Sequence, residues 1–239
     1  MLLVGHRGAR GEAPENTLAG FAHARAVGVD ALELDVRLSA DGQLVVIHDQ
    51  TVDRTTDATG PVGSFTAAEL ARLDARASCP AWPEPVGVPT LDAVLERFGA
   101  EGRFAVEIKR DAPERMARVA ALLTDAIRAR GLQGRTIVTS FEPEALALAR
   151  RLAPALPRAY IGAYDGPAFL ETALALGCAQ ADVPLATGSA EVVRAARARG
   201  LRVCGWLGNS TEALRRLVVW GVDAITIDLP TMARCELAR

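Results

Sequence analysis

Short runs of apolar and β-branched residues alternate along the chain with longer stretches rich in alanine, leucine and arginine. The short runs have the length of strands, and the longer stretches repeat their apolar positions with the period of a helix. Eight strands are predicted in this way, at residues 2–6, 31–36, 104–108, 136–140, 158–161, 178–183, 202–206 and 224–227. Helices are predicted near residues 16–27, 90–99, 113–130, 143–151, 167–176, 189–199 and 211–220, and glycines directly follow several of them.

This alternation predicts repeated βα units around a parallel sheet. Eight strands with alternating helices are typical of a (β/α)8 TIM barrel, which takes about 250 residues, and the chain has 239. We therefore expect a single α/β barrel domain over residues 1–239, with its active site at the carboxyl ends of the strands. A doubly wound sheet is the alternative, but no glycine-rich fingerprint follows the first strand.

One stretch after the second strand interrupts the alternation. Residues 39–43 read Ser-Ala-Asp-Gly-Gln, a turn-forming cluster, and the extended run 44–48 follows at once. Because so short a connection cannot reach a parallel partner, the run should pair antiparallel with the second strand and bring His48 back to about the level of Asp35. Residues 50–89, with one short helical stretch near 66–73, are expected to form a small insertion or lid over the barrel mouth.

Composition narrows the classes of function. With 50% apolar and 23% charged residues, the chain should fold rather than stay disordered. A formal net charge of −2 gives no basic stripe for a nucleic acid, so no such partner is expected. No window holds the roughly 18 apolar residues of a membrane span, and no leader precedes the first strand, so we expect a cytoplasmic protein without stable membrane insertion. The four cysteines, Cys79, Cys178, Cys204 and Cys235, are far apart and are expected to be free thiols.

Acidic residues gather on one face of two predicted strands. Glu33, Asp35 and Arg37 alternate with apolar residues in the second strand, and Glu107 and Lys109 do so in the third. Because side chains alternate at period two, these charged faces should converge inside the barrel. Buried charges need a partner or a metal, so one interpretation is a structural network in which Arg7, Arg37 and Lys109 neutralise the three carboxylates. The favoured interpretation is a hard divalent cation, Mg²⁺ or Ca²⁺, held by carboxylate oxygens.

The rare residues of the chain sharpen this hypothesis. Of 27 basic residues only Lys109 is a lysine, which suggests a position where a flexible ammonium is needed. His6 ends the first strand and His48 ends the hairpin, whereas His23 falls inside a predicted helix and is expected to be structural. Two histidines at one mouth resemble a general acid–base pair, and Asp49 is placed to orient His48. With a divalent cation, these groups favour hydrolysis of a phosphodiester.

Fragments along most of the chain fit one known pattern in order and spacing. They are His6-Arg7-Gly8, Pro14-Glu15-Asn16-Thr17, Glu33 with Asp35, Asp41-Gly42, His48-Asp49, Glu107 with Lys109, Trp206, and the closing run from Gly221 to Pro230. From near residue 4 to near residue 230, the chain resembles the glycerophosphodiester phosphodiesterase family of the PLC-like phosphodiesterase barrels. The resemblance implies a metal-dependent TIM-barrel enzyme that cleaves glycerophosphodiesters into glycerol 3-phosphate and an alcohol. One departure is the run 206–209, Trp-Leu-Gly-Asn, where the family often has Trp-Thr-Val-Asn.

The resemblance also implies a role for individual residues. The metal ligands would be Glu33, Asp35 and Glu107. The acid–base pair would be His6 and His48, and the phosphate contacts would come from Arg7 and Lys109. In the family's route His6 would activate the glycerol 2-hydroxyl or water, and His48 would protonate the departing alcohol.

Two further residues have two interpretations each. Asn16 opens the first predicted helix, either as an N-cap worth about 1 kcal/mol or as a brace behind the metal ligands. Trp206 either packs in the core or forms a wall for the glycerol or leaving group, where its indole could contact a cationic alcohol such as choline. The short insertion at 50–89 leaves little protein to contact a bulky alcohol, which favours a small headgroup.

Other functions on the same barrel are weighed against this one. An isomerase or aldolase need not carry two histidines beside a phosphate-binding arginine, and a non-catalytic barrel that binds a phosphorylated ligand should have lost part of the set. A phospholipase of C or D type, acting on intact or lyso-phospholipids, shares the parts, and an exposed apolar rim on the lid would favour it. The expected partner is a small glycerophosphodiester, and association into a homodimer is left open.

Overall fold

The computed structural model describes residues 1–238, which form nine strands and nine α-helices. The strands are β1 (Leu2–Gly5), β2 (Ala31–Leu38), β3 (Leu44–Val46), β4 (Phe104–Ile108), β5 (Thr136–Ser140), β6 (Arg158–Ile161), β7 (Gln180–Pro184), β8 (Arg202–Trp206) and β9 (Ala224–Ile227). The helices are α1 (Leu18–Val27), α2 (Ala67–Leu70), α3 (Leu91–Phe98), α4 (Pro113–Ala129), α5 (Pro143–Leu152), α6 (Pro167–Ala175), α7 (Ala190–Ala198), α8 (Thr211–Trp220) and α9 (Pro230–Leu237). Two 3₁₀ turns, Val62–Ser64 and Gln133–Arg135, complete the set.

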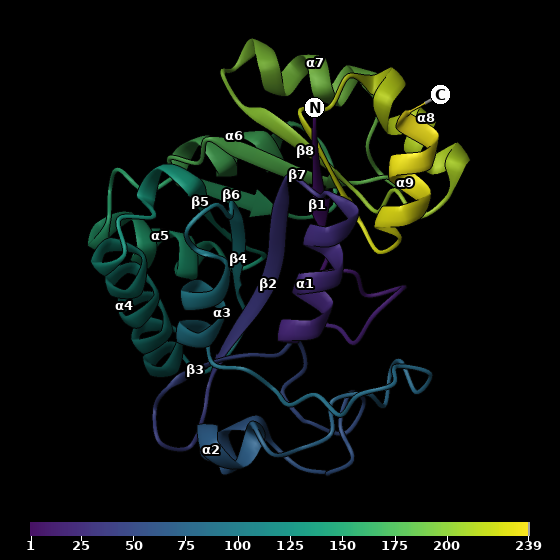
Figure 1. Ribbon diagram of the computed structural model, residues 1–239. Helices are drawn as coiled ribbons and strands as arrows, with labels where there is room; N and C mark the ends of the chain where they lie inside the picture. The colour runs from purple at the N-terminus through teal and green to yellow at the C-terminus, as the bar shows by residue number, and fades with distance from the viewer. Residues whose placement is uncertain (239) are drawn as a thin grey trace.

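Eight of the strands are parallel and close into a ring. Their order is β1-β9-β8-β7-β6-β5-β4-β2, and the pairing of β1 with β2, Val4 opposite Ala31, joins the two ends. The helices lie around the outside of this ring (Figure 1). The closed ring confirms the (β/α)8 barrel and excludes the doubly wound alternative, in which the sheet would stay open.

The predicted elements coincide with the observed ones, and the differences have local causes. β1 ends at Gly5, so His6 is the first loop residue after the strand. β7 covers Gln180–Pro184 rather than 178–183, and β2 continues to Leu38 because β3 pairs with its end, Leu38 opposite Leu44. That pairing confirms the predicted antiparallel hairpin. Helix α9 was not predicted, because its eight residues show little apolar periodicity.

Helix ends follow local chemistry. The hydroxyls of Thr17, Thr90 and Ser210 accept hydrogen bonds from backbone amides in the first turns of α1, α3 and α8. Gly28 and Gly221 end α1 and α8 in the left-handed conformation that glycine adopts without steric cost.

The core lies mainly between the barrel and its helices. One apolar cluster packs β2 and β4 against α1, α3 and α4, and a second packs β7, β8 and β9 against α6, α7 and α8. Inside the ring the apolar residues are fewer and smaller, among them Val4, Ala31, Cys204 and Ala224. Barrels of this kind are usually filled by bulky branched side chains, so this interior is loosely filled.

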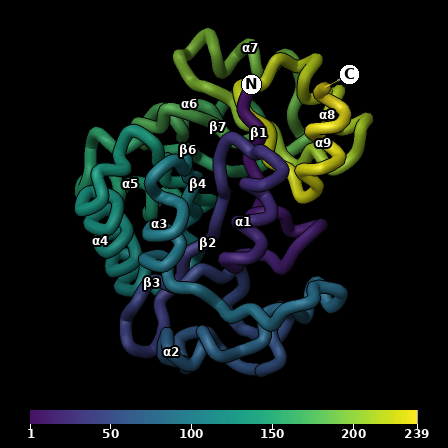
Figure 2. Tube along the Cα trace, viewed as in Figure 1, coloured from purple at the N-terminus to yellow at the C-terminus, as the bar shows by residue number. Residues whose placement is uncertain are grey.

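The insertion at 50–89 has a small core of its own. Val52, Val62, Leu70 and Val88 pack with side chains of the hairpin. The segment carries α2 and lies at the end of the molecule opposite both termini, beyond the carboxyl ends of β1 and β2 (Figures 1 and 2). No helix in residues 1–238 is long and apolar enough to cross a membrane.

Candidate active site

Three carboxylates meet at the carboxyl ends of two adjacent strands. Glu33 and Asp35 come from β2 and Glu107 from β4, with Asp35 in register with Glu107. One oxygen of each lies within 4.8 Å of the others. Their residues are 8%, 1% and 7% exposed. Three acidic groups this close and this buried are unstable as free anions, so the site requires compensating positive charge.

The pKa values of the three carboxyl groups reflect this need for positive charge. Burial and the neighbouring carboxylates raise the pKa of Glu33 well above its usual range, and burial together with Asp35 raises the pKa of Glu107 to about 7. Burial also opposes ionisation of Asp35, but the ammonium of Lys109 and the guanidinium of Arg7 hold its pKa below the usual range. Protein cations therefore compensate one carboxylate, and the other two remain short of positive charge.

The donor set fits a divalent metal ion. The Oδ1 atom of Asp35 is buried and has no hydrogen-bond partner within residues 1–238, although Nζ of Lys109 lies 3.4 Å away. Nζ of Lys109 also lies 2.6 Å from Oε1 of Glu107. All three acidic side chains offer oxygen, the ligand that Mg²⁺ and Ca²⁺ prefer. A cation at this point would supply Asp35 with its missing partner and relieve the repulsion.

Two residues with left-handed backbones hold the carboxylates from the first loop. Arg7 and Asn16 have φ angles of 50° and 55°. The backbone amide of Arg7 donates to Oε2 of Glu33 at 2.8 Å, and its Nε lies 3.3 Å from Oδ2 of Asp35. Nδ2 of Asn16 donates to the same Asp35 oxygen at 2.8 Å. The N-cap of α1 is Thr17, not Asn16, so of the two interpretations of Asn16 the geometry fits the brace.

The Nδ1 atom of His6 is hydrogen-bonded to an aspartate. Oδ1 of Asp228, the first residue after β9, lies 2.5 Å from this nitrogen. Asn209 fixes the aspartate, because its Nδ2 donates to Asp228 Oδ2 at 2.7 Å and its Oδ1 accepts from the Asp228 amide at 2.8 Å. The other ring nitrogen, Nε2, lies 4.0 Å from Oε2 of Glu33, so it is directed at the carboxylates.

His48 has the same arrangement on the opposite side. Its Nδ1 lies 2.6 Å from Oδ1 of Asp49, and Arg54 donates through Nε to Oδ2 of Asp49 at 2.6 Å. Arg54 also donates two hydrogen bonds to the Glu15 carboxylate, at 2.8 and 2.9 Å. Glu15 accepts a third hydrogen bond, from Nη1 of Arg7, at 2.9 Å. The insertion thus reaches the first loop through one arginine, and this contact fixes the aspartate that holds His48.

These two pairs determine which nitrogen can react. An ionised aspartate only accepts hydrogen bonds, so Nδ1 of each histidine must carry the proton, which leaves Nε2 as the exchangeable atom. Burial opposes ionisation of Asp49, but hydrogen bonds from Arg54 and His48 lower its pKa to about 2. Burial lowers the pKa of His48 below its usual range. The site therefore offers two oriented imidazoles beside the cluster of three carboxylates.

Arg37 makes its hydrogen bonds with the backbone. It donates to two backbone carbonyls, that of His48 at 2.9 Å through Nε and that of Arg110 at 3.1 Å through Nη1. No ion pair joins Arg37 to the three carboxylates within residues 1–238, although the charges of Asp35 and Glu107 oppose the lowering of its pKa by burial.

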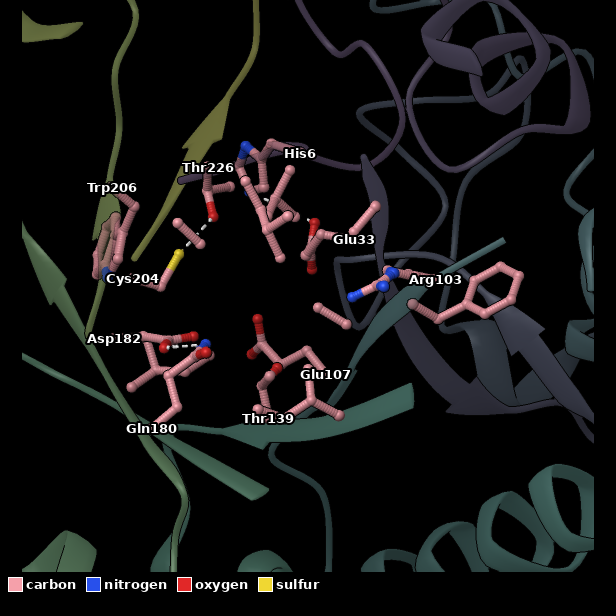
Figure 3. A pocket seen from close by; sticks show the side chains of 18 of the residues that line it. His6, Glu33, Arg103, Glu107, Thr139, Gln180, Asp182, Cys204, Trp206 and Thr226 are labelled. Atoms are coloured by element: carbon pink, nitrogen blue, oxygen red, sulfur yellow. Dashed lines mark hydrogen bonds and ion pairs between the residues drawn. The ribbon is translucent and has the colours of Figure 1, made fainter. Parts of the chain in front are cut away.

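A cavity of about 410 Å³ contains the site. His6, Glu33 and Glu107 line it together with Trp206 from the end of β8 (Figure 3). The indole of Trp206 packs edge-on against Phe141, with ring centres 6.0 Å apart. Trp206 therefore forms one wall of the mouth.

His23 carries no part of this site, and of the four cysteines only Cys204 lines its cavity. His23 bonds Glu12 at 2.8 Å and packs edge-on against Trp82, away from the cavity. The cysteines are free thiols, as expected.

Several residues of the site were not assigned a role from sequence. They are Asp228, Asn209, Arg54 and Glu15. A signal existed for Asp228, because it directly follows a predicted barrel strand, where functional residues gather. Arg54 and Glu15 lie 39 residues apart in two irregular segments, and no spacing rule connects them.

Comparison with known proteins identifies the family of this chain. A model of the glycerophosphoryl diester phosphodiesterase family matches residues 6–232. The chain belongs to this family. It is similar to a glycerophosphodiester phosphodiesterase of Bacillus altitudinis, with 32% identity over 97% of this chain and 96% of that one. It is also similar to one of Caldanaerobacter subterraneus subsp. tengcongensis, with 33% identity over 96% and 94%. The expectation of a phosphodiesterase of this family is confirmed.

Solved structures agree with the family assignment. A glycerophosphoryl diester phosphodiesterase from Silicibacter pomeroyi, described as putative, superposes with a TM-score of 0.92 and 29% identity over 100% of this chain and 93% of that one. A phosphodiesterase from Oleispira antarctica, in complex with the product sn-glycerol-3-phosphate, also gives 0.92, with 27% identity over 100% and 97%.

Proposed function

We propose that this member of the family hydrolyses glycerophosphodiesters to glycerol 3-phosphate and an alcohol, with a divalent metal ion, Mg²⁺ or Ca²⁺, and a pair of histidines. The observation that carries the proposal is the presence of two aspartate-oriented histidines, His6 and His48, around one cluster of three carboxylates. The relative from Oleispira antarctica, which holds sn-glycerol-3-phosphate, supports the same product here.

Five side chains would bind the reacting phosphate and its cation. Glu33, Asp35 and Glu107 would hold the metal, which supplies positive charge to the non-bridging oxygens of the phosphate. Arg7 and Lys109 lie beside these carboxylates and would contact the same phosphate oxygens. Both cations are already held by carboxylates, so they need little reorganisation as charge develops on the phosphate.

The histidines would transfer the protons. Nδ1 of His6 faces Asp228 at 2.5 Å, and this anion stabilises the imidazolium that forms when Nε2 takes a proton from the glycerol 2-hydroxyl or from water. The lowered pKa of His48 makes its protonated form the stronger acid, which suits donation of a proton to the departing alcohol. Asp49 and Arg54 keep that imidazole in place.

A small substrate fits this site better than an intact lipid. Among residues 1–238, the exposed large apolar side chains are Met1, Phe141, Leu152, Leu174, Val218, Val219 and Leu237. The insertion at 50–89 contributes none of them, so the lid has no apolar rim of the kind that a lipid surface requires. Phe141 is the one residue of this set that lines the cavity.

The test is release of glycerol 3-phosphate from a panel of diesters by chelator-stripped protein, with and without added Mg²⁺ or Ca²⁺. We expect release that depends on the metal and is lost in His6→Ala and Glu33→Ala. The roles of the histidines are separated with a nitrophenyl ester, whose leaving group needs no proton. His48→Ala should keep activity on this ester, and His6→Ala should not. Folded, metal-binding protein that releases nothing from any diester would refute the proposal.

A further inference from the structure

The cavity of the barrel has a second end, on the face opposite the candidate active site. Its space of about 410 Å³ continues through the ring to the amino ends of the strands. Four residues line it there and define what we call the amino-end pocket: Arg103, Gly134, Arg135 and Arg202. All of these except Arg135 are exposed, and a Cβ atom added at Gly134 would meet nothing within 4 Å. The amino-end pocket is therefore accessible from solvent.

The three arginines of this pocket occupy equivalent positions on three strands. Each stands two residues before a residue that lines the cavity, namely Ala105, Ile137 and Cys204. Because side chains alternate at period two, the arginines belong to the inward face of β4, β5 and β8. In the ring β4 and β5 are neighbours, and β8 lies across from β4. Figure 3 shows the guanidinium of Arg103 turned toward the cavity. Positive charge therefore converges on this opening from both sides of the ring.

The protein itself leaves most of this charge without a partner. Within residues 1–238 the side chains of Arg103 and Arg202 make no hydrogen bond and no ion pair. Asp182 interacts electrostatically with Arg202, but its Oδ1 accepts the hydrogen bond of Gln180 at 2.8 Å. Arg135 donates through Nη1 to a single backbone carbonyl, at 2.5 Å. The donors of three guanidinium groups thus remain available to a ligand.

Other charged residues at the amino ends of the strands have partners outside the cavity. Arg158 on β6 donates to three backbone carbonyls. Asp223 forms an ion pair with Arg197 at 2.7 Å, and Asp30 accepts from the backbone amide of Leu3 at 2.8 Å. Arginines that stabilise carbonyls near helix ends are a common structural use of this residue. The arginines of the amino-end pocket differ, because they line a cavity and two of them contact no carbonyl or carboxylate.

We propose that the amino-end pocket binds a small phosphate dianion, either inorganic phosphate or the phosphate group of a monoester. Guanidinium groups bind phosphate oxygens through pairs of N–H donors, and a tetrahedral dianion has oxygens for three arginines at once. The charge of the dianion would also compensate theirs. The site lies inside a cavity, so a nucleic acid or the acidic face of a protein does not fit it. This inference goes beyond the proposed function and does not depend on it, because the carboxylates and histidines lie at the other end of the strands.

The experiment is titration calorimetry of the full chain, with added Mg²⁺, against inorganic phosphate. Arg202→Gln removes one guanidinium from the amino-end pocket. Its matched control is Arg118→Gln, which removes the same charge from an exposed position on α4. We expect Arg202→Gln to lower the affinity for phosphate at this pocket about tenfold, as expected for a hydrogen bond to a charged group. Arg118→Gln should match the parent.

A second pair of variants keeps every arginine in place. Gly134→Glu puts a carboxylate at the rim of the pocket, where it competes with the anion, and Gly134→Ala adds only a methyl group to open space. We expect Gly134→Glu to abolish binding at this pocket and Gly134→Ala to retain it. Lys109→Met weakens any phosphate bound at the candidate active site and should leave the amino-end pocket unchanged. Loss of binding in Lys109→Met alone, with Arg202→Gln and Gly134→Glu equal to the parent, would overturn the proposal.

A crystal structure with phosphate diffused in locates the anion. We expect phosphate within hydrogen-bonding distance of Arg103 and Arg202 in the parent and none there in Gly134→Glu. Phosphate found only beside the carboxylates, or half-saturation only at the concentrations of a crystal soak, would overturn the site.

Competition with glycerol 3-phosphate identifies the source of the dianion. Equal affinities at the amino-end pocket show that the phosphate group alone is recognised, whereas a tenfold preference identifies the preferred compound as the ligand. None of these readouts requires turnover. A parent that binds phosphate at this pocket but hydrolyses no diester would therefore refute the proposed function alone.

Discussion

Asp182 makes the stability of this protein depend on pH in a way that one substitution should remove. Its carboxyl lies inside the barrel, and burial raises its pKa to about 7 from an ordinary 3.8, although the Gln180 amide and Arg202 oppose the shift. The folded state therefore keeps a proton between about pH 4 and pH 7 that the unfolded chain has already released. The free energy of unfolding must fall as pH rises through this range and level off above it.

The size of this effect follows from the shift. A difference of about 3 pH units, at about 1.4 kcal/mol per unit, gives a loss of about 4 kcal/mol that is complete above pH 7. Asp182→Asn cannot ionise, and its amide oxygen can still accept the hydrogen bond from Gln180. We expect the variant to match the parent near pH 4 and to exceed its free energy of unfolding by about 4 kcal/mol at pH 8.

The assay is urea unfolding from pH 4.5 to pH 8, followed by circular dichroism in metal-free buffer. The control is Asp165→Asn, which removes a charge from an exposed loop and should run parallel to the parent. Titration of Glu33, Asp35 and Glu107 is common to all three proteins and cancels in the differences. A difference between Asp182→Asn and the parent that does not change with pH, or that favours the parent above pH 7, would refute the reasoning.

Three further substitutions test the contacts around the histidines and Asp35. Asp228→Asn takes the anion from Nδ1 of His6 and should lower kcat roughly 10–100-fold while metal affinity in titration calorimetry stays the same; an equal fall in affinity would contradict the assignment. Arg54→Met breaks the link between the insertion and Asp49 and should lower kcat about tenfold, with little recovery in Arg54→Lys because an ammonium cannot replace the two-pronged guanidinium. Asn16→Ala removes a hydrogen bond to buried Asp35 and forces alanine into a left-handed backbone, so urea unfolding should show that the free energy of unfolding falls by about 2 kcal/mol. Asn16→Gly removes only the hydrogen bond, so its free energy of unfolding should fall by less.

Much of the fold and part of the site follow from local rules. The alternation of side chains along a strand is geometric, so Glu33 and Asp35 had to share one face of β2, and Glu107 had to face the same way on β4. Likewise the turn at 39–43 was too short for anything but a hairpin, which brought His48 to the mouth. These inferences needed only the chain within a few residues and the knowledge that a barrel has one interior.

Local rules of this kind could not predict contacts between segments that are distant in the sequence. Asp228 and His6 stand 222 residues apart, and they meet only because β1 pairs with β9 when the ring closes. Arg54 reaches Glu15 because the insertion packs beside the first loop, a position that its own sequence does not encode. Arg37 shows the converse, since its charge suggested a carboxylate partner and the tertiary structure gave it backbone carbonyls.

The sequence by itself determined the barrel, the faces of its strands and the residue types available for chemistry, because periodicity and turn length act over a few residues. Only the tertiary structure decided how each histidine is oriented, which residue caps α1, and that the interior is hollow. A cavity depends on the sizes of side chains that face one another across the ring, and alanines at 31, 105 and 224 look unremarkable in any one strand. Their effect appears only when closure brings them together around one unfilled space.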